Sequence, residues 1–295
     1  MAPHPAVLAY RGGSAVARAL PRPVAARAAD VGGRVAARVL AGRRRQMSRH
    51  LRRVRPDLTG ADLERATREA FGSYARYWVE SFRLPGMSAV DLDRRFAYRG
   101  YEHILAAREQ GHGAIIALPH LGGWEWAAFW MTVIEDVPVT AVVEPLDPPE
   151  LFAWFADYRR SLGMEVVPLG PDAGRAVVRA LRDRHVLCLV CDRDLPGDGV
   201  EVEFFGERTT LPAGPATLAL RTGAPLLPTA IYFRDGGGHF ADVRAPLPVE
   251  RRGSLRDDVA RITQDLAHAL EELIAAAPEQ WHLMQPNWPS DHDAT

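Results

Sequence analysis

The chain has 295 residues, of which 47% are hydrophobic and 25% are charged. This length and composition suit one large globular domain with a substantial core, and they exclude a disordered or fibrous protein. The two cysteines, Cys188 and Cys191, give no disulfide framework and indicate a reducing compartment.

The first 56 residues are strongly basic, with 13 arginines and a single acid, Asp30. We predict helices over residues 6–30 and 33–54, separated at the Gly32–Gly33 pair. Arginines interrupt every apolar run, so the segment is not a secretory signal or a membrane span of roughly 20 apolar residues. A basic amphipathic helix on an anionic membrane surface and a solvated helical lid explain the pattern equally well. The sequence has no nucleic-acid-binding motif, which argues against a nucleic-acid partner.

Residues 57–295 have the pattern of one α/β domain, to which residues 1–56 add a basic helical N-terminal extension. A helix with a buried face is predicted over residues 59–82. Further helices are expected at 101–110, 124–133, 149–163, 172–183, 213–223 and 254–276. Strands are expected at 114–119, 139–144, 165–169, 186–191, 200–205, 225–233 and 239–245. Apolar strands that alternate with helices indicate a mostly parallel central sheet flanked by helices on both faces.

The strand at 114–119 leads into His120, a Gly122–Gly123 turn and Glu125. Ligands of open α/β sheets bind beyond the carboxyl ends of the strands, so these side chains are candidates for chemistry. A histidine held by a carboxylate is a general base for a hydroxyl group or water. The alternative is a buried loop in which Glu125 only occupies the first turn of the next helix.

The strand at 186–191 ends in Asp192, Arg193 and Asp194. One interpretation is a charged turn with internal Asp–Arg pairing. The other is the D-x-D motif with which a metal-dependent glycosyltransferase holds a nucleotide-sugar diphosphate.

Two further charges, Glu144 and Arg159, lie near predicted strand ends, although each alone is typical of a surface or structural charge. Cys188 and Cys191 are three residues apart in a strand, so they point to opposite faces and are interpreted as core residues rather than metal ligands. The sequence contains no G-x-S-x-G, Walker A or H-E-x-x-H motif. Direct transfer between two bound substrates, with no metal, is therefore the simplest reaction to expect.

Several blocks together resemble the phosphatidylinositol mannoside acyltransferases of actinobacteria, a branch of the glycerolipid and lipid A acyltransferases. The blocks are "YARYWVESFRLPGM", "LPHLGGWEWA", "DRDLPGDGVEVEFFGE", "LPAGPATLALRTGAPLLP" and "WHLMQPNW". The resemblance extends from about Tyr74 to Trp288. It implies transfer of a long-chain acyl group, typically palmitoyl, from acyl-CoA to a mannose hydroxyl of a phosphatidylinositol mannoside. It implies no cofactor or metal besides acyl-CoA as co-substrate.

The resemblance also implies roles for individual residues. His120 would deprotonate the mannose 6-hydroxyl, which attacks the thioester without a covalent acyl-enzyme. Glu125 matches the carboxylate that orients the histidine, and Asp192 matches a second carboxylate beside it. Glu125 stands where this branch usually has Asp, and Asp192 where it usually has Glu. Further substrate-binding positions are Glu144, Arg159 and Arg193.

The basic N-terminal helices then suit a peripheral membrane protein on the cytoplasmic face of the plasma membrane. Trp124, Trp126, Phe129 and Trp130 are candidates for an acyl-chain tunnel, although core packing explains most of them. Two alternatives remain, namely a glycosyltransferase that uses Asp192 and Asp194, and a non-catalytic lipid-binding relative.

Overall fold

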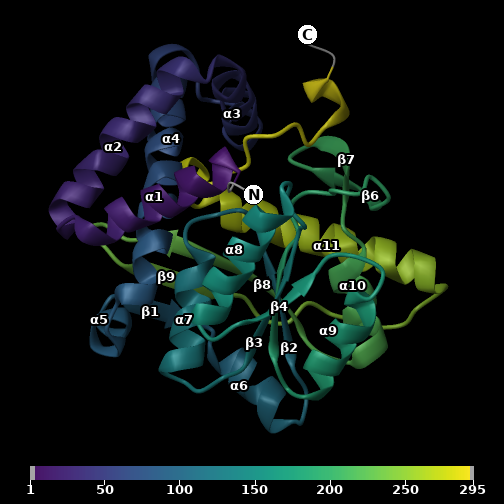
Figure 1. Cartoon of the computed structure of the whole chain (residues 1–295). Helices are drawn as coiled ribbons and strands as arrows, with labels where there is room; N and C mark the ends of the chain where they lie inside the picture. The colour runs from purple at the N-terminus through teal and green to yellow at the C-terminus, as the bar shows by residue number, and fades with distance from the viewer. Residues whose placement is uncertain (1–3, 293–295) are drawn as a thin grey trace.

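The computed structural model describes residues 4–292, which form a single α/β domain with an N-terminal helical segment (Figure 1). The central sheet has the strand order β1-β9-β8-β2-β5-β3-β4. All neighbouring strands are parallel except β8 and β9, so the predicted fold class is confirmed. The strands are β1 (Phe96–Arg99), β2 (Ala114–Leu118), β3 (Val139–Val143), β4 (Glu165–Pro168), β5 (Val186–Val190), β8 (Leu226–Phe233) and β9 (His239–Val243).

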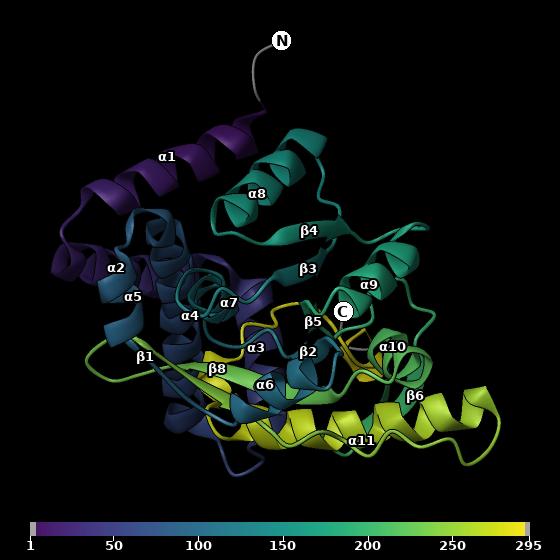
Figure 2. The same cartoon turned by 90° about the horizontal axis from the view of Figure 1, so that it is seen from below.

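Helices cover both faces of the sheet, and α11 lies along one of them (Figure 2). The first face packs against α5 (Ala89–Arg94), α6 (Glu102–Glu109), α7 (Trp124–Val133) and α8 (Pro149–Ser161). The second packs against α9 (Ala173–Arg182), α10 (Gly214–Thr222) and α11 (Leu255–Ala275). In β2, Ile115 and Ala117 point into the second core, whereas Ile116 and Leu118 point into the first. Burial on both faces explains why the sequence of this strand is an uninterrupted apolar run.

The N-terminal segment forms three helices that pack on the long helix α4. Their bounds are α1 (Pro5–Ala19), α2 (Arg22–Val39), α3 (Ala41–Val54) and α4 (Gly60–Arg83). The helix break predicted at Gly32–Gly33 was wrong, because the chain breaks at Pro21 and again at Leu40. Gly33 lies inside α2, where a Cβ atom would come within 2.8 Å of the backbone of Gly72 in α4. This glycine therefore permits close packing of two helices rather than a turn.

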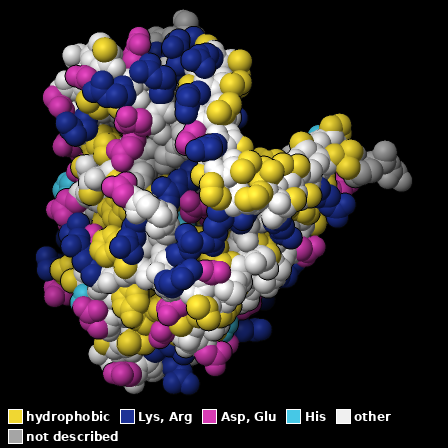
Figure 3. Space-filling model, turned by 90° about the vertical axis from the view of Figure 1, so that its left-hand side faces the viewer, with side chains coloured by type: hydrophobic (Ala, Val, Ile, Leu, Met, Phe, Trp, Pro, Cys, Tyr) yellow, Lys and Arg dark blue, Asp and Glu magenta, His cyan; other side chains and the backbone are white. Residues whose placement is uncertain are grey.

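α1 projects from the body of the molecule beside α8, and apolar side chains lie along its surface (Figure 3). Among residues 4–292, no helix is both long and apolar enough to cross a membrane.

Some of the short elements differ from the prediction. β1 and α5 were missed, and the predicted strand at 200–205 does not join the main sheet. It forms β6 (Val200–Phe204) of a separate antiparallel hairpin with β7 (Glu207–Leu211). After α11, the chain passes through the 3₁₀ turns η2 (Pro278–Gln280) and η3 (Pro289–Asp291), and the segment between them crosses the carboxyl edge of the sheet.

Candidate active site

Strand β2 delivers His120 into a tight turn at the carboxyl edge of the sheet. The strand ends at Leu118, and Pro119 leads directly into His120. Gly122 has a φ of +59°, and a Cβ atom there would lie 1.6 Å from the carbonyl oxygen of Ile231. Only glycine fits this position, and the chain then enters α7.

The imidazole of His120 is paired with the carboxylate of Asp192. In the sheet, Leu118 of β2 lies opposite Val190 of β5, so the residues two positions further along also meet. His120 Nδ1 lies 2.6 Å from Asp192 Oδ1, and the His120 backbone N–H donates to Oδ2 at 2.9 Å. The carboxylate is completely buried, whereas 45% of the histidine side chain is exposed. One ring nitrogen is therefore fixed and the imidazole is open to a substrate.

The C-terminal segment holds this pair in place. Trp281 Nε1 donates to Asp192 Oδ2 at 2.7 Å, and Asn287 Nδ2 donates to the Asp192 carbonyl oxygen at 3.0 Å. The His282 backbone N–H donates to the His120 carbonyl oxygen at 2.6 Å. Neither Trp281 nor Asn287 was predicted as a site residue. Their only signal was their place in the terminal block "WHLMQPNW".

Electrostatics stabilise the ionised form of the pair. Burial acts to lower the pKa of His120, but the charge and hydrogen bond of Asp192 raise it, and the net shift is upward. Burial acts to raise the pKa of Asp192, but the charge and hydrogen bond of His120 and the hydrogen bond from Trp281 lower it overall. An ionised carboxylate only accepts hydrogen bonds, so Nδ1 carries the proton of neutral His120 and Nε2 is the basic nitrogen.

The other predicted site residues fall into two groups. Glu144 is exposed and Arg193 is half-buried. The charge of Glu144 raises the pKa of His120, whereas the charge of Arg193 lowers it. Glu125 and Arg159 form the second group, with Glu125 Oε1 accepting from Arg159 Nη2 at 3.2 Å and from the Tyr77 hydroxyl at 2.9 Å.

The structure therefore differs from the expected pairing of Glu125 with His120, because the hydrogen-bond partner of His120 Nδ1 is Asp192. Glu125 is in the first turn of α7, and its side chain is only 2% exposed. The helix directs this carboxylate toward α4 and α8, where Tyr77 and Arg159 both donate to its Oε1, while Oε2 is buried and accepts no hydrogen bond. Five residues of separation suggested a pair, but the turn and the helix point the two side chains in different directions.

Asp194 caps a surface turn. Its Oδ1 accepts the backbone N–H of Gly197 at 3.1 Å, and its Oδ2 accepts that of Gly199 at 2.8 Å. A D-x-D metal site needs carboxylate oxygens that face a shared cation, but here the oxygens of Asp192 and Asp194 are used in separate hydrogen-bond networks. The part of the chain that the structure describes contains no group of three or more His, Cys, Asp or Glu side chains suited to a metal ion.

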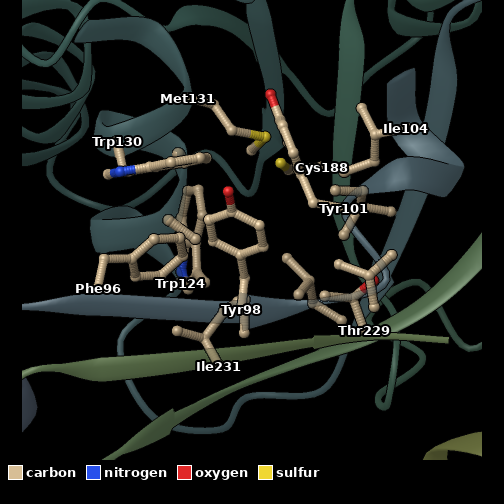
Figure 4. Close-up of a pocket in the computed structure, with 16 residues that line it drawn as sticks. Phe96, Tyr98, Tyr101, Ile104, Trp124, Trp130, Met131, Cys188, Thr229 and Ile231 are labelled. Carbon is tan, nitrogen blue, oxygen red and sulfur yellow. The ribbon is translucent and has the colours of Figure 1, made fainter. Parts of the chain in front are cut away.

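An apolar cavity lies beside β2, on the side of the sheet covered by α7 (Figure 4). Its lining includes Leu118, two residues before His120, and Trp124 at the start of α7. The rings of Tyr98 and Trp130, whose centroids lie 5.0 Å apart, also line it (Figure 4). Trp126 and Phe129 are buried in the core, outside the lining of this cavity. The enclosed space is about 30 Å³, so the walls are nearly closed.

Comparison with known proteins shows which family the chain resembles. The model of the bacterial lipid A biosynthesis acyltransferases matches residues 3–290. A phosphatidylinositol mannoside acyltransferase of Mycobacterium tuberculosis (strain CDC 1551 / Oshkosh) is 41% identical, over 96% of this chain and 88% of that protein. The protein of the same description from Mycolicibacterium smegmatis is also 41% identical, over 96% of this chain and 91% of its own length.

Proposed function

The chain belongs to the bacterial lipid A biosynthesis acyltransferase family, and from this premise we propose that it acylates a phosphatidylinositol mannoside. The donor in this proposal is a long-chain acyl-CoA, such as palmitoyl-CoA, and no metal or other cofactor takes part. The observation that carries the proposal is the pairing of half-exposed His120 with fully buried Asp192. Such a pair activates a hydroxyl group for direct attack on a thioester.

In the proposed reaction, His120 Nε2 removes the proton of a mannose hydroxyl while the hydroxyl oxygen attacks the thioester carbonyl carbon. The tetrahedral intermediate collapses, the carbon–sulfur bond breaks, and the CoA thiolate receives the proton from the imidazolium. Asp192 stabilises the imidazolium and keeps the required tautomer. Arg193 and Glu144 are proposed to bind substrate at the mouth of the site. Glu125 and Arg159 are proposed to position α7, because their ion pair joins the first turn of α7 to the last turn of α8.

The apolar cavity of Figure 4 is the proposed site for the acyl chain. It begins along the strand that presents His120, so a chain inside it would bring its thioester toward the imidazole. Each buried CH₂ group contributes about 0.8 kcal/mol, which favours insertion of a long chain. With about 30 Å³ enclosed, the lining side chains must rotate apart to admit the chain.

The N-terminal helices are the proposed contact with an anionic membrane surface, on the cytoplasmic face of the plasma membrane. Helix α2 has valines that are between 47% and 55% exposed, namely Val24, Val31 and Val35. They lie in the segment with 13 arginines, and a helix with apolar and basic exposed residues binds at the interface of anionic lipid. Replacing Val31 and Val35 by Asp should reduce cosedimentation with anionic vesicles, whereas unchanged binding would contradict this role.

The test of the reaction is incubation of the purified protein with radiolabelled palmitoyl-CoA and a choice of acceptors. Labelled phosphatidylinositol mannoside, with little label on phosphatidylinositol, supports the proposal. Equal labelling of both lipids contradicts a mannose acceptor. Acceptor binding without turnover indicates a non-catalytic lipid-binding relative, and sugar transfer that requires a divalent cation indicates the glycosyltransferase alternative.

A further inference from the structure

A second cavity, away from the His120–Asp192 pair, lies between α2, α4 and the turn that joins β8 to β9. It encloses about 390 Å³, far more than the cavity beside β2. Four arginines from three parts of the chain line it, namely Arg22, Arg76, Arg83 and Arg95. Figure 3 looks onto this side of the molecule, where basic side chains gather with acidic ones among them.

Two of the four guanidinium groups are satisfied by the protein. Arg76 donates to Glu80 Oε1 at 2.6 Å and lies over the ring of Phe233, 4.4 Å from its centroid. Arg83 donates to the carbonyl oxygens of Ala17 and Leu20. These contacts fix the positions of both side chains in the cavity wall.

The other two guanidinium groups lack a protein acceptor. Within residues 4–292, neither the Arg22 nor the Arg95 side chain donates a hydrogen bond to the protein, although both side chains are half-buried. Arg95 Nε is completely buried and without a partner. A buried donor without an acceptor is destabilising, and more so when the group is charged. An acceptor from outside the chain would remove this cost.

The charges that line the cavity do not balance. Against four arginines, the acidic residues in the lining are Glu80 and Asp30. Glu80 Oε1 accepts a hydrogen bond from Arg76, Glu80 Oε2 lies 3.4 Å from His239 Nε2 and accepts no hydrogen bond, and Asp30 is exposed. Burial and the neighbouring charge of Arg95 lower the pKa of Arg22, in spite of an opposing contribution from Asp91. The cavity thus has an excess of positive charge and free donors.

Helix α2 also begins at this cavity. Its first residue is Arg22, and Pro21, which precedes it, provides no side-chain hydrogen bond to the first turn. An uncapped helix N-terminus has unpaired N–H groups and a partial positive charge that favour an anion. This feature adds to the free arginine donors.

We propose that this cavity binds a phosphate group, with Arg22 and Arg95 as its principal donors. Guanidinium groups donate pairs of hydrogen bonds to phosphate oxygens, which matches two unpaired arginines held beside two fixed ones. The phosphate belongs either to a phospholipid headgroup, because the exposed Val24 lies next to the cavity on α2, or to a soluble molecule such as CoA. The site does not depend on the proposed acyl transfer, and its test reads binding rather than activity.

The experiment is calorimetric titration of the full chain with inorganic phosphate, with CoA and with vesicles that contain phosphatidylinositol. The variants are Arg95→Gln and Arg22→Gln, and the control is Arg27→Gln, an exposed arginine on the same helix that does not line the cavity. Loss of one charge-assisted hydrogen bond should weaken binding at least tenfold in the first two variants. The control should bind as the wild type does.

The pattern across ligands identifies the source of the phosphate. Loss of vesicle binding in the variants assigns the site to a lipid headgroup, and loss of CoA binding alone assigns it to a soluble phosphate. Equal affinity in wild type and Arg95→Gln would overturn the proposal, as would an equal loss in Arg27→Gln. Absence of saturable binding of all three ligands to the wild type would overturn it as well. Circular dichroism melts would verify that each variant is folded.

Discussion

Replacement of Asp192 by Asn tests the electrostatic pairing of the site. In the wild type, Asp192 Oδ1 accepts the His120 Nδ1–H, and Oδ2 accepts N–H groups of Trp281 and the His120 backbone. An amide has one oxygen and one NH₂ group. If the NH₂ group takes the place of Oδ2, it faces two donors, the Trp281 indole N–H and the His120 backbone N–H. The opposite orientation directs it at His120 Nδ1 and moves the ring proton to Nε2, which can then no longer act as the base.

The magnitude follows from the bonds that are lost. Hydrogen bonds to charged groups are worth about 1.5–3 kcal/mol each, so losing two costs about 3–6 kcal/mol. If this loss falls on the transition state, kcat/KM decreases by about 10²–10⁴-fold.

The pH profile distinguishes this effect from simple unfolding. Only neutral His120 is a base, so activity should rise with pH through the histidine pKa. Asp192 raises that pKa, so the acidic limb of wild-type kcat/KM should lie above the ordinary histidine value of about 6.5. Without the carboxylate charge, the limb of Asp192→Asn should move to lower pH.

Initial rates of acyl transfer between pH 5 and 9 measure both quantities. Asp194→Asn is the matched control, because Asp194 follows two residues later but accepts only backbone N–H groups of its own turn. It should leave the acidic limb in place. If Asp192→Asn keeps the wild-type limb and a rate within about threefold of the wild type, the pairing account of the site is wrong.

Three further changes probe the surroundings of the pair. Glu125→Gln breaks a buried ion pair with Arg159 and should lower the free energy of unfolding by about 3 kcal/mol in urea titrations. The acidic limb of the pH–rate profile should stay in place. A displaced limb would show that Glu125 acts on the base directly. Gly122→Ala meets the Ile231 carbonyl at positive φ and should cost about 3 kcal/mol of stability, so a thermal melt like that of the wild type would refute the close approach. Burial and the charge on His120 lower the pKa of His282 to about 3, so the unfolded chain binds an extra proton below its ordinary pKa of about 6.5. Stability should therefore fall as pH drops from about 6.5 toward 3, by up to roughly 1.4 kcal/mol per pH unit, and His282→Gln should flatten this dependence; an unchanged slope would exclude His282 as its cause.

The sheet was predictable wherever strands are buried on both faces. Strands such as β2 and β5 are continuous apolar runs because each side of them faces a core. The edge strand β1 was missed because it has only four residues and is partly exposed, and the hairpin strand β7 because most of its residues are polar. The break at Gly32–Gly33 was misplaced because the sequence cannot show that Gly33 serves a helix contact with Gly72.

The candidate site was predictable residue by residue, but its pairing was not. His120 and Asp192 were identified because each follows an apolar strand, and strand order then brings them together. Glu125 was assigned to His120 because it lies nearby in the sequence, whereas the first turn of α7 directs it elsewhere. Trp281 reaches Asp192 from 89 residues away, a contact that no local pattern encodes.

The role of His120 as general base is tested by measuring acyl transfer from radiolabelled palmitoyl-CoA to phosphatidylinositol mannoside with the wild type and His120→Ala, in the presence of a chelator. The imidazole is half-exposed, so its removal should leave the fold intact, which circular dichroism verifies. We expect labelled product from the wild type and a loss of at least about 10²-fold in the variant. Comparable product from both proteins would contradict His120 as the catalytic base.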